Sequence, residues 1–139
     1  MKNAFIYSLK AWLTTLLIAP LILFAIQKHN GGCKYCDYRE YYWTFIGELM
    51  GYFLLLLSLF VAVILIAKNH TLGSAKPLII ITGIALTVLN VLLIEFLTYL
   101  YKGLIIELYS LEVLLTYPLI MGLGLWFYVL KPVTKIHDL

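Results

Sequence analysis

Four runs without a charged residue constrain this chain more than any other feature of its sequence. A helix needs about 20 apolar residues to cross a hydrocarbon core about 30 Å thick. Only 12% of the residues are charged and 63% are apolar. In soluble domains about 25% of the residues are charged and about 45–50% are apolar. The sequence therefore predicts an all-α, polytopic membrane protein with four transmembrane helices in an up-down antiparallel bundle. The uncharged runs cover residues 11–27, 49–67, 77–94 and 113–130.

The rest of the chain is divided among two tails and three loops, and none of these is long enough for a soluble domain. This excludes a cytosolic enzyme, a DNA-binding domain and a receptor with a large ectodomain, and no nucleic-acid partner is expected. We expect one domain over residues 1–139, with the lipid bilayer as its solvent. The predicted helices cover about residues 5–27, 43–67, 77–101 and 109–130.

The first run has features of a signal peptide but is predicted to be a retained helix. Lys2 and Lys10 precede it, as in a signal peptide. However, the run exceeds the 7–15 residues typical of such an apolar region, and no small-residue cleavage site closes it. Pro20 lies inside it and is expected to kink the helix.

The distribution of cations predicts the orientation. Cytoplasmic loops carry an excess of Lys and Arg, so the side with more cations is expected to be inside. This predicts an N-in, C-in protein of the bacterial inner (plasma) membrane, with an extracytoplasmic loop at residues 28–42. Six cations lie on the side of the amino terminus: Lys2, Lys10, Lys68, Lys76, Lys131 and Lys135. Four lie on the other side: Lys28, Lys34, Arg39 and Lys102.

Both cysteines lie in the first outer loop, as Cys33 and Cys36. Three interpretations of this C-x-x-C pair stay open. The pair is a structural disulfide in an oxidising compartment, or a redox-active pair with a lowered thiol pKa. The third is a metal site completed by His29 with Asp37 or Glu40. Zinc usually takes four ligands and no second such pair is present, so no metal is predicted.

The stretch from Cys33 to Arg39, set in a four-span layout, resembles the DsbB-type quinone-linked disulfide generators. The resemblance implies that Cys33 and Cys36 pass electrons to a quinone near the start of the second helix. Otherwise no cofactor is expected. The likeness covers about ten residues plus the topology, and residues 102–109 lack the second cysteine pair of that family. The chain is therefore not assigned to it.

Carboxylates near the outer boundary form the second candidate site. Glu48 and Glu95 are expected at similar depth in antiparallel helices, with Tyr52 and Tyr99 four residues after them as hydrogen-bond donors. Three interpretations stay open: an interhelical cluster that fixes helix register, a proton or cation site, and carboxylates that reach the interface. The predicted binding residues are Glu48, Glu95, Tyr52, Tyr99, Lys102, Arg39 and Glu112.

Two further patterns concern packing and the interface. Nine of the eleven tyrosines belong to the half that contains the first outer loop, which is typical of an interfacial aromatic belt. Gly83, Thr87 and Asn90 form a small and polar stripe on the third helix, which predicts a helix-packing seam.

No complete catalytic or nucleotide-binding motif is present. We therefore expect a non-catalytic binding, assembly or protective partner that acts through its extracytoplasmic end on another membrane or extracytoplasmic protein. A homo-oligomer is compatible with this. Two alternatives stay open: a membrane thiol–disulfide oxidoreductase using Cys33 and Cys36, and a small proton- or cation-coupled carrier using Glu48 and Glu95.

Overall fold

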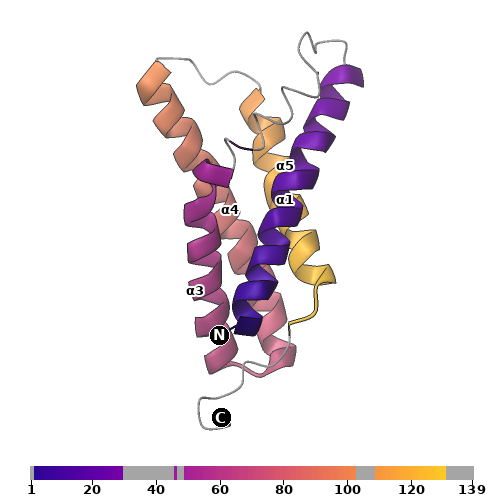
Figure 1. The fold of residues 1–139 in the computed structure, drawn as a ribbon, viewed down its shortest axis with the longest axis vertical. Helices are drawn as coiled ribbons and strands as arrows, with labels where there is room; N and C mark the ends of the chain where they lie inside the picture. The colour runs from indigo at the N-terminus through magenta and orange to yellow at the C-terminus, as the bar shows by residue number, and fades with distance from the viewer. Residues whose placement is uncertain (1, 30–45, 47–48, 103–108, 131–139) are drawn as a thin grey trace.

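The structure, a computed structural model, describes residues 2–29, 46, 49–102 and 109–130. These residues form long helices and contain no strand, which confirms the all-α prediction. Successive helices run in opposite directions, so the described part of the chain is an up-down bundle (Figure 1). Its helices are α1 (Lys2–His29), α3 (Phe53–Asn69), α4 (Leu72–Lys102) and α5 (Tyr109–Phe127).

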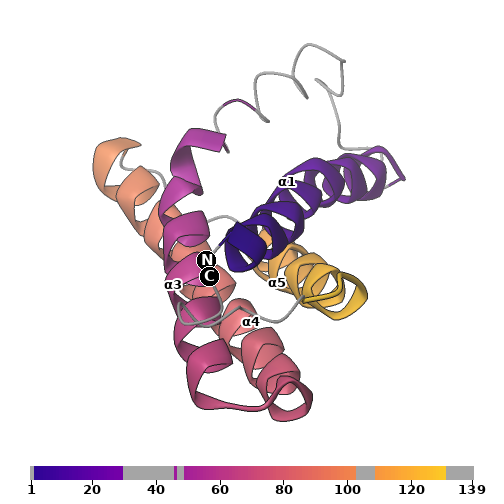
Figure 2. The same cartoon turned by 60° about the horizontal axis from the view of Figure 1, so that its bottom comes forward.

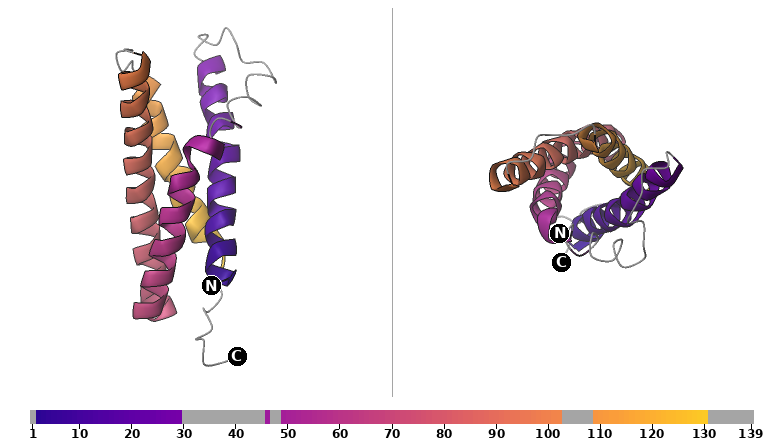
Figure 3. Two further views of the ribbon diagram at one scale, coloured as in Figure 1. Left: turned by 60° about the vertical axis from the view of Figure 1, so that its left-hand side comes forward. Right: turned by 90° about the horizontal axis from the view of Figure 1, so that it is seen from above.

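The helices surround a common core in the order α1, α3, α4, α5. The helix α5 packs most extensively, against α4 on one side and α1 on the other, and α3 lies between α1 and α4. Figures 2 and 3 show this arrangement from other directions. Both α1 and α4 begin where α3 and α5 end. We call this the lysine end, because Lys2, Lys68 and Lys76 lie there.

Two helices are long and apolar enough to cross a membrane: Lys2–Ile26, with a mean hydropathy of 2.0, and Gly73–Leu97, with 2.5. The other two apolar segments in the described residues, Phe53–Asn69 and Val113–Phe127, are shorter. Crossing by all four helices is therefore not confirmed. For the second helix the difference has a local cause, because a turn at Tyr52 separates α3 from the helical residues 49–51.

The connection between α3 and α4 is shorter than the gap between the predicted helices 43–67 and 77–101. The helix α4 begins at Leu72, and Pro77 lies inside it. Thr71 makes this early start favourable: its carbonyl accepts a hydrogen bond from the Ala75 amide at 2.8 Å, and its hydroxyl lies 3.0 Å from the Ser74 hydroxyl. The Thr71 carbonyl also accepts a hydrogen bond from the Ser74 amide at 3.1 Å, which is one of the first-turn donors that would otherwise lack a partner in the helix.

The predicted packing seam is confirmed. A Cβ built on Gly83 would lie 2.2 Å from Leu125 Cδ1 of α5, so the two helices approach as closely as they do only because residue 83 has no side chain. Thr87 and Asn90 are buried on the same helix, and the Thr87 hydroxyl donates to the Gly83 carbonyl at 2.7 Å.

Apolar side chains fill the core and also cover much of the surface of the described helices. Four polar side chains are buried in the bundle: Ser8, Thr15, Thr87 and Asn90. Large apolar side chains are exposed on every helix, among them Leu21 at 53%, Val61 at 53%, Ile81 at 65% and Leu119 at 62%. Scattered exposed leucines are ordinary, but large apolar side chains exposed along every described helix are typical of a surface that contacts a membrane or another protein.

Candidate functional site

Most of the predicted site falls outside the described residues. Cys33, Cys36, Arg39 and Glu48 lie there, together with the predicted extracytoplasmic loop 28–42 beyond His29. The cysteine pair and the proximity of Glu48 to Glu95 therefore stay predictions. In the described part of the chain, no three His, Cys, Asp or Glu side chains gather into a group that could hold a metal ion.

Four other predicted residues lie on helices at the end opposite the lysine end. Tyr99 and Lys102 belong to the last turns of α4, and Glu112 belongs to the first turn of α5, but their side chains are outside the description. Glu95 is half-buried on α4. It lies about two turns before the end of α4.

Tyr52, which was predicted as a hydrogen-bond donor to Glu48, also packs against two other helices. Its ring stacks on Tyr117 of α5, with centroids 5.3 Å apart and planes 6° from parallel. Its carbonyl accepts hydrogen bonds from Trp12 Nε1 of α1 at 2.8 Å and from the Leu56 amide at 3.2 Å. Tyr52 therefore joins three helices at the start of α3.

At the lysine end, α1 is tied to the end of α5 by side-chain hydrogen bonds. The Tyr7 hydroxyl donates to the carbonyl of Leu125, and the hydroxyls of Thr14 and Tyr128 bond to each other. The last four carbonyls of a helix have no partner within it. Leu125 contributes one of these in α5, so Tyr7 of another helix caps this end.

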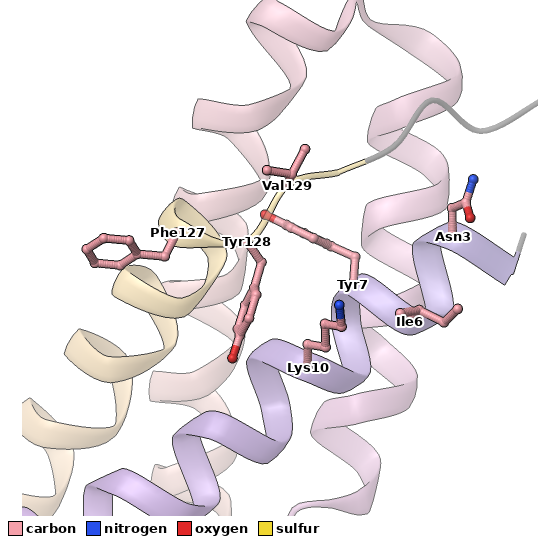
Figure 4. Close-up of a pocket in the computed structure, with 7 residues that line it drawn as sticks. All are labelled: Asn3, Ile6, Tyr7, Lys10, Phe127, Tyr128 and Val129. Carbon is pink, nitrogen blue, oxygen red and sulfur yellow. The ribbon is translucent and has the colours of Figure 1, made fainter.

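A pocket of about 520 Å³ lies beside these hydrogen bonds. It is within the range of about 300–1,000 Å³ that is typical of ligand sites. Figure 4 shows the Lys10 side chain extending from α1 between the two tyrosines, with its ammonium 6.0 Å from the centre of the Tyr128 ring. Its lining residues are Asn3, Ile6, Tyr7, Lys10, Phe127, Tyr128 and Val129.

The described lining of the pocket carries a positive charge. Lys10 is the one charged residue among the lining residues that the structure describes, and Lys2 lies two turns away at the start of α1. Among the side chains that the structure describes, the one carboxylate is Glu95, which lies near the far end of α4. An anion is therefore the ligand that this charge distribution favours.

The sequence did not predict this pocket, because the predicted site was placed in the half that contains most of the tyrosines. Nine tyrosines were assigned to the opposite half, and the two that remained, Tyr7 and Tyr128, both line the pocket. A signal was present nonetheless. Lys10 is the last charged residue before the uncharged run 11–27. Tyr128 lies three residues before Lys131, the first charged residue after the run 113–130.

No protein-family model, no curated protein and no solved structure matches this chain.

Proposed function

We propose that this chain is a small integral membrane protein in which all four helices cross the bilayer. It acts without catalysis of its own, as a binding, assembly or protective partner for another membrane or extracytoplasmic protein. The end opposite the lysine end makes that contact, and the proposed location is the bacterial inner membrane with both termini inside.

The observation that carries the proposal is the number of large apolar side chains exposed on the described helices. In hydrocarbon, exposed Ile81, Leu89 and Leu119 meet a solvent as apolar as themselves, at exposures of 65%, 63% and 62%. Polar groups are then most stable inside the bundle, where Thr15 and Thr87 donate to carbonyls of their own helices. The same surface in water would be an aggregation site.

The lengths of the shorter helices are compatible with crossing. The 17 residues of α3 and the 19 residues of α5 give helices about 26 Å and about 29 Å long, against a hydrocarbon core of about 30 Å. Tilt and local bilayer thinning accommodate a mismatch of a few ångströms. The cations at the lysine end favour a cytoplasmic position for that end.

The opposite end is the proposed contact surface for two reasons. It contains the cysteines and most of the tyrosines, and large apolar side chains are exposed there. Both cysteines and nine of the eleven tyrosines belong to this half of the sequence. On α4, Phe96, Leu97 and Leu100 are 56%, 54% and 62% exposed. Exposed apolar side chains that lie together in this way are typical of surfaces that contact a protein or a membrane.

A photo-crosslinking amino acid at Phe96 tests the proposal in native membranes. We expect a covalent adduct with a second protein there. The matched control is Phe5, which is 41% exposed near the lysine end and is expected to give lipid adducts alone. Lipid adducts alone at both positions would contradict a protein contact at the proposed end.

The same system separates the proposal from its catalytic rivals. A chain with Cys33→Ser and Cys36→Ser is expected to keep the Phe96 adduct and to restore a strain that lacks the protein. A mixed disulfide trapped by Cys33→Ser alone would favour the quinone-linked oxidoreductase instead. A proton-driven flux abolished by Glu95→Gln would favour the carrier.

A further inference from the structure

We propose that the pocket at the lysine end binds the phosphate headgroup of an anionic phospholipid, with Lys10 as its charge partner. This inference rests on the proposed function, because it requires that end of the bundle to lie in the headgroup layer. Nothing in the proposed protein contact at the opposite end depends on it.

The position of the pocket along the chain supports a headgroup ligand. The uncharged run of the first helix begins directly after Lys10, and that of the last helix ends at residue 130. The pocket is lined by Lys10 from α1 and by residues 127–129 at the end of α5. Two separate boundaries between charged and apolar sequence therefore meet at this pocket, as expected where hydrocarbon meets phosphate.

The charge and the donors of the pocket match a phosphate. Lys10 lies about 12 Å along α1 from its first residue. An ammonium at this depth is stable when its long side chain reaches the interface and pairs with an anion. The Lys10 ammonium lies over the Tyr128 ring at 6.0 Å from its centre, and no described carboxylate is near enough to neutralise it. The Asn3 amide, one turn closer to the start of α1 than Tyr7, lines the same pocket.

An apolar stripe leads from the pocket toward the bilayer centre and fits an acyl chain. It consists of Leu115, Leu119, Leu123 and Phe127, spaced four residues apart on α5 and 63%, 62%, 46% and 76% exposed. Residues at this spacing lie on one side of a helix. The stripe covers about 18 Å along the axis, slightly more than half of the hydrocarbon core. A headgroup in the pocket thus places its tail on α5.

The experiment measures retention of lipid by the full-length protein purified in detergent, using native mass spectrometry. The probes are phosphatidylglycerol and phosphatidylcholine with identical acyl chains. We expect the wild-type chain to prefer phosphatidylglycerol. Lys10→Ala is expected to weaken its binding about tenfold, the loss typical of one charge-assisted contact. Lys68→Ala, at the same end of the bundle but outside the pocket, is the matched control and is expected to bind normally.

Two further variants keep the test decisive if Lys10→Ala impairs folding. Lys10→Arg preserves the charge and is expected to preserve binding. Ile6→Trp adds bulk to the pocket while keeping Lys10, and is expected to weaken binding. Equal retention by Lys10→Ala and the wild type, or no preference between the two lipids, would overturn the proposal.

Competition with soluble phosphate compounds distinguishes binding of the lipid from binding of a free anion. Inorganic phosphate and glycerol phosphate, added at the concentration of the lipid, are expected not to displace phosphatidylglycerol, because they lack the acyl chain that contacts α5. Displacement by either compound would assign the pocket to a soluble phosphate and overturn the lipid proposal. Failure of the proposed function has a different signature: alkaline carbonate would then release the protein from membranes, whatever lipid it retains in detergent.

Discussion

The two sides of α5 are joined to their neighbours by different means. Toward α4 the contact depends on absent side chains: Gly83 makes room for Leu125, and Gly122 makes room for Ile84, whose Cδ1 would lie 3.0 Å from an added Cβ. Toward α1 the contact at the lysine end includes two hydrogen bonds, between the Tyr7 hydroxyl and the Leu125 carbonyl and between the hydroxyls of Thr14 and Tyr128. The pocket lies on the α1 side of α5, beside these hydrogen bonds.

The largest expected effect is at the glycine contact. Gly83→Leu forces α4 away from Leu125, and overpacking of this kind destabilises a protein by about 3 kcal/mol. Unfolding in mixed detergent micelles, followed by circular dichroism, measures the loss. Gly73→Leu is the control, because nothing lies within 4 Å of a Cβ at that position. Equal effects of the two variants would contradict a close contact between α4 and α5.

A second-site change sharpens this prediction. Leu125→Ala removes the side chain that Leu at position 83 would meet, so the double variant is expected to be more stable than the sum of the single losses predicts. A coupling of about 1 kcal/mol or more is typical of residues in direct contact. Strict additivity would contradict the contact.

A smaller effect is expected at the hydrogen bond between α1 and α5. Tyr7→Phe removes the donor to the Leu125 carbonyl and leaves that buried acceptor without a partner, which costs about 1.5 kcal/mol. The same unfolding measurement applies. Tyr7→Phe with unchanged stability would mean that the hydroxyl does not cap α5.

The smallest effect is expected for Tyr128→Phe. Its hydrogen bond to Thr14 is partly exposed, so water or a lipid headgroup can replace it, and the loss is about 0.5 kcal/mol. The ring that faces Lys10 is retained in this variant. A loss as large as that of Tyr7→Phe would contradict the difference in burial between the two bonds.

The comparison also separates what the sequence could predict from what it could not. The helices follow from the lengths of the uncharged runs, and the contact with α4 follows from Gly83, Thr87 and Asn90, because small and polar residues at helical spacing form a seam whatever their neighbour is. The contact with α1 could not be predicted in this way. Tyr7 donates to a backbone carbonyl of Leu125, and every residue offers such an acceptor.

The start of α3 shows the same limit. The uncharged run predicts a continuous helix through Tyr52, but the helix is interrupted there, at a residue that contacts two other helices. Trp12 and Tyr117 are 40 and 65 positions away in the sequence. A periodicity calculated within one segment contains no information about them.

The central claim is that lipid surrounds α3 and α5, the two shorter helices, as well as α1 and α4. Single cysteines at Leu57 of α3 and Leu119 of α5, in a chain with Cys33 and Cys36 changed to serine, test it most directly. Both positions are exposed on the bundle, at 44% and 62%. In opened membrane vesicles, a membrane-impermeant maleimide is expected to label a cysteine at His70, in the turn between α3 and α4, and to leave both helix positions unlabelled. Labelling at 57 and 119 as fast as at 70 would place these helices in water and contradict the account.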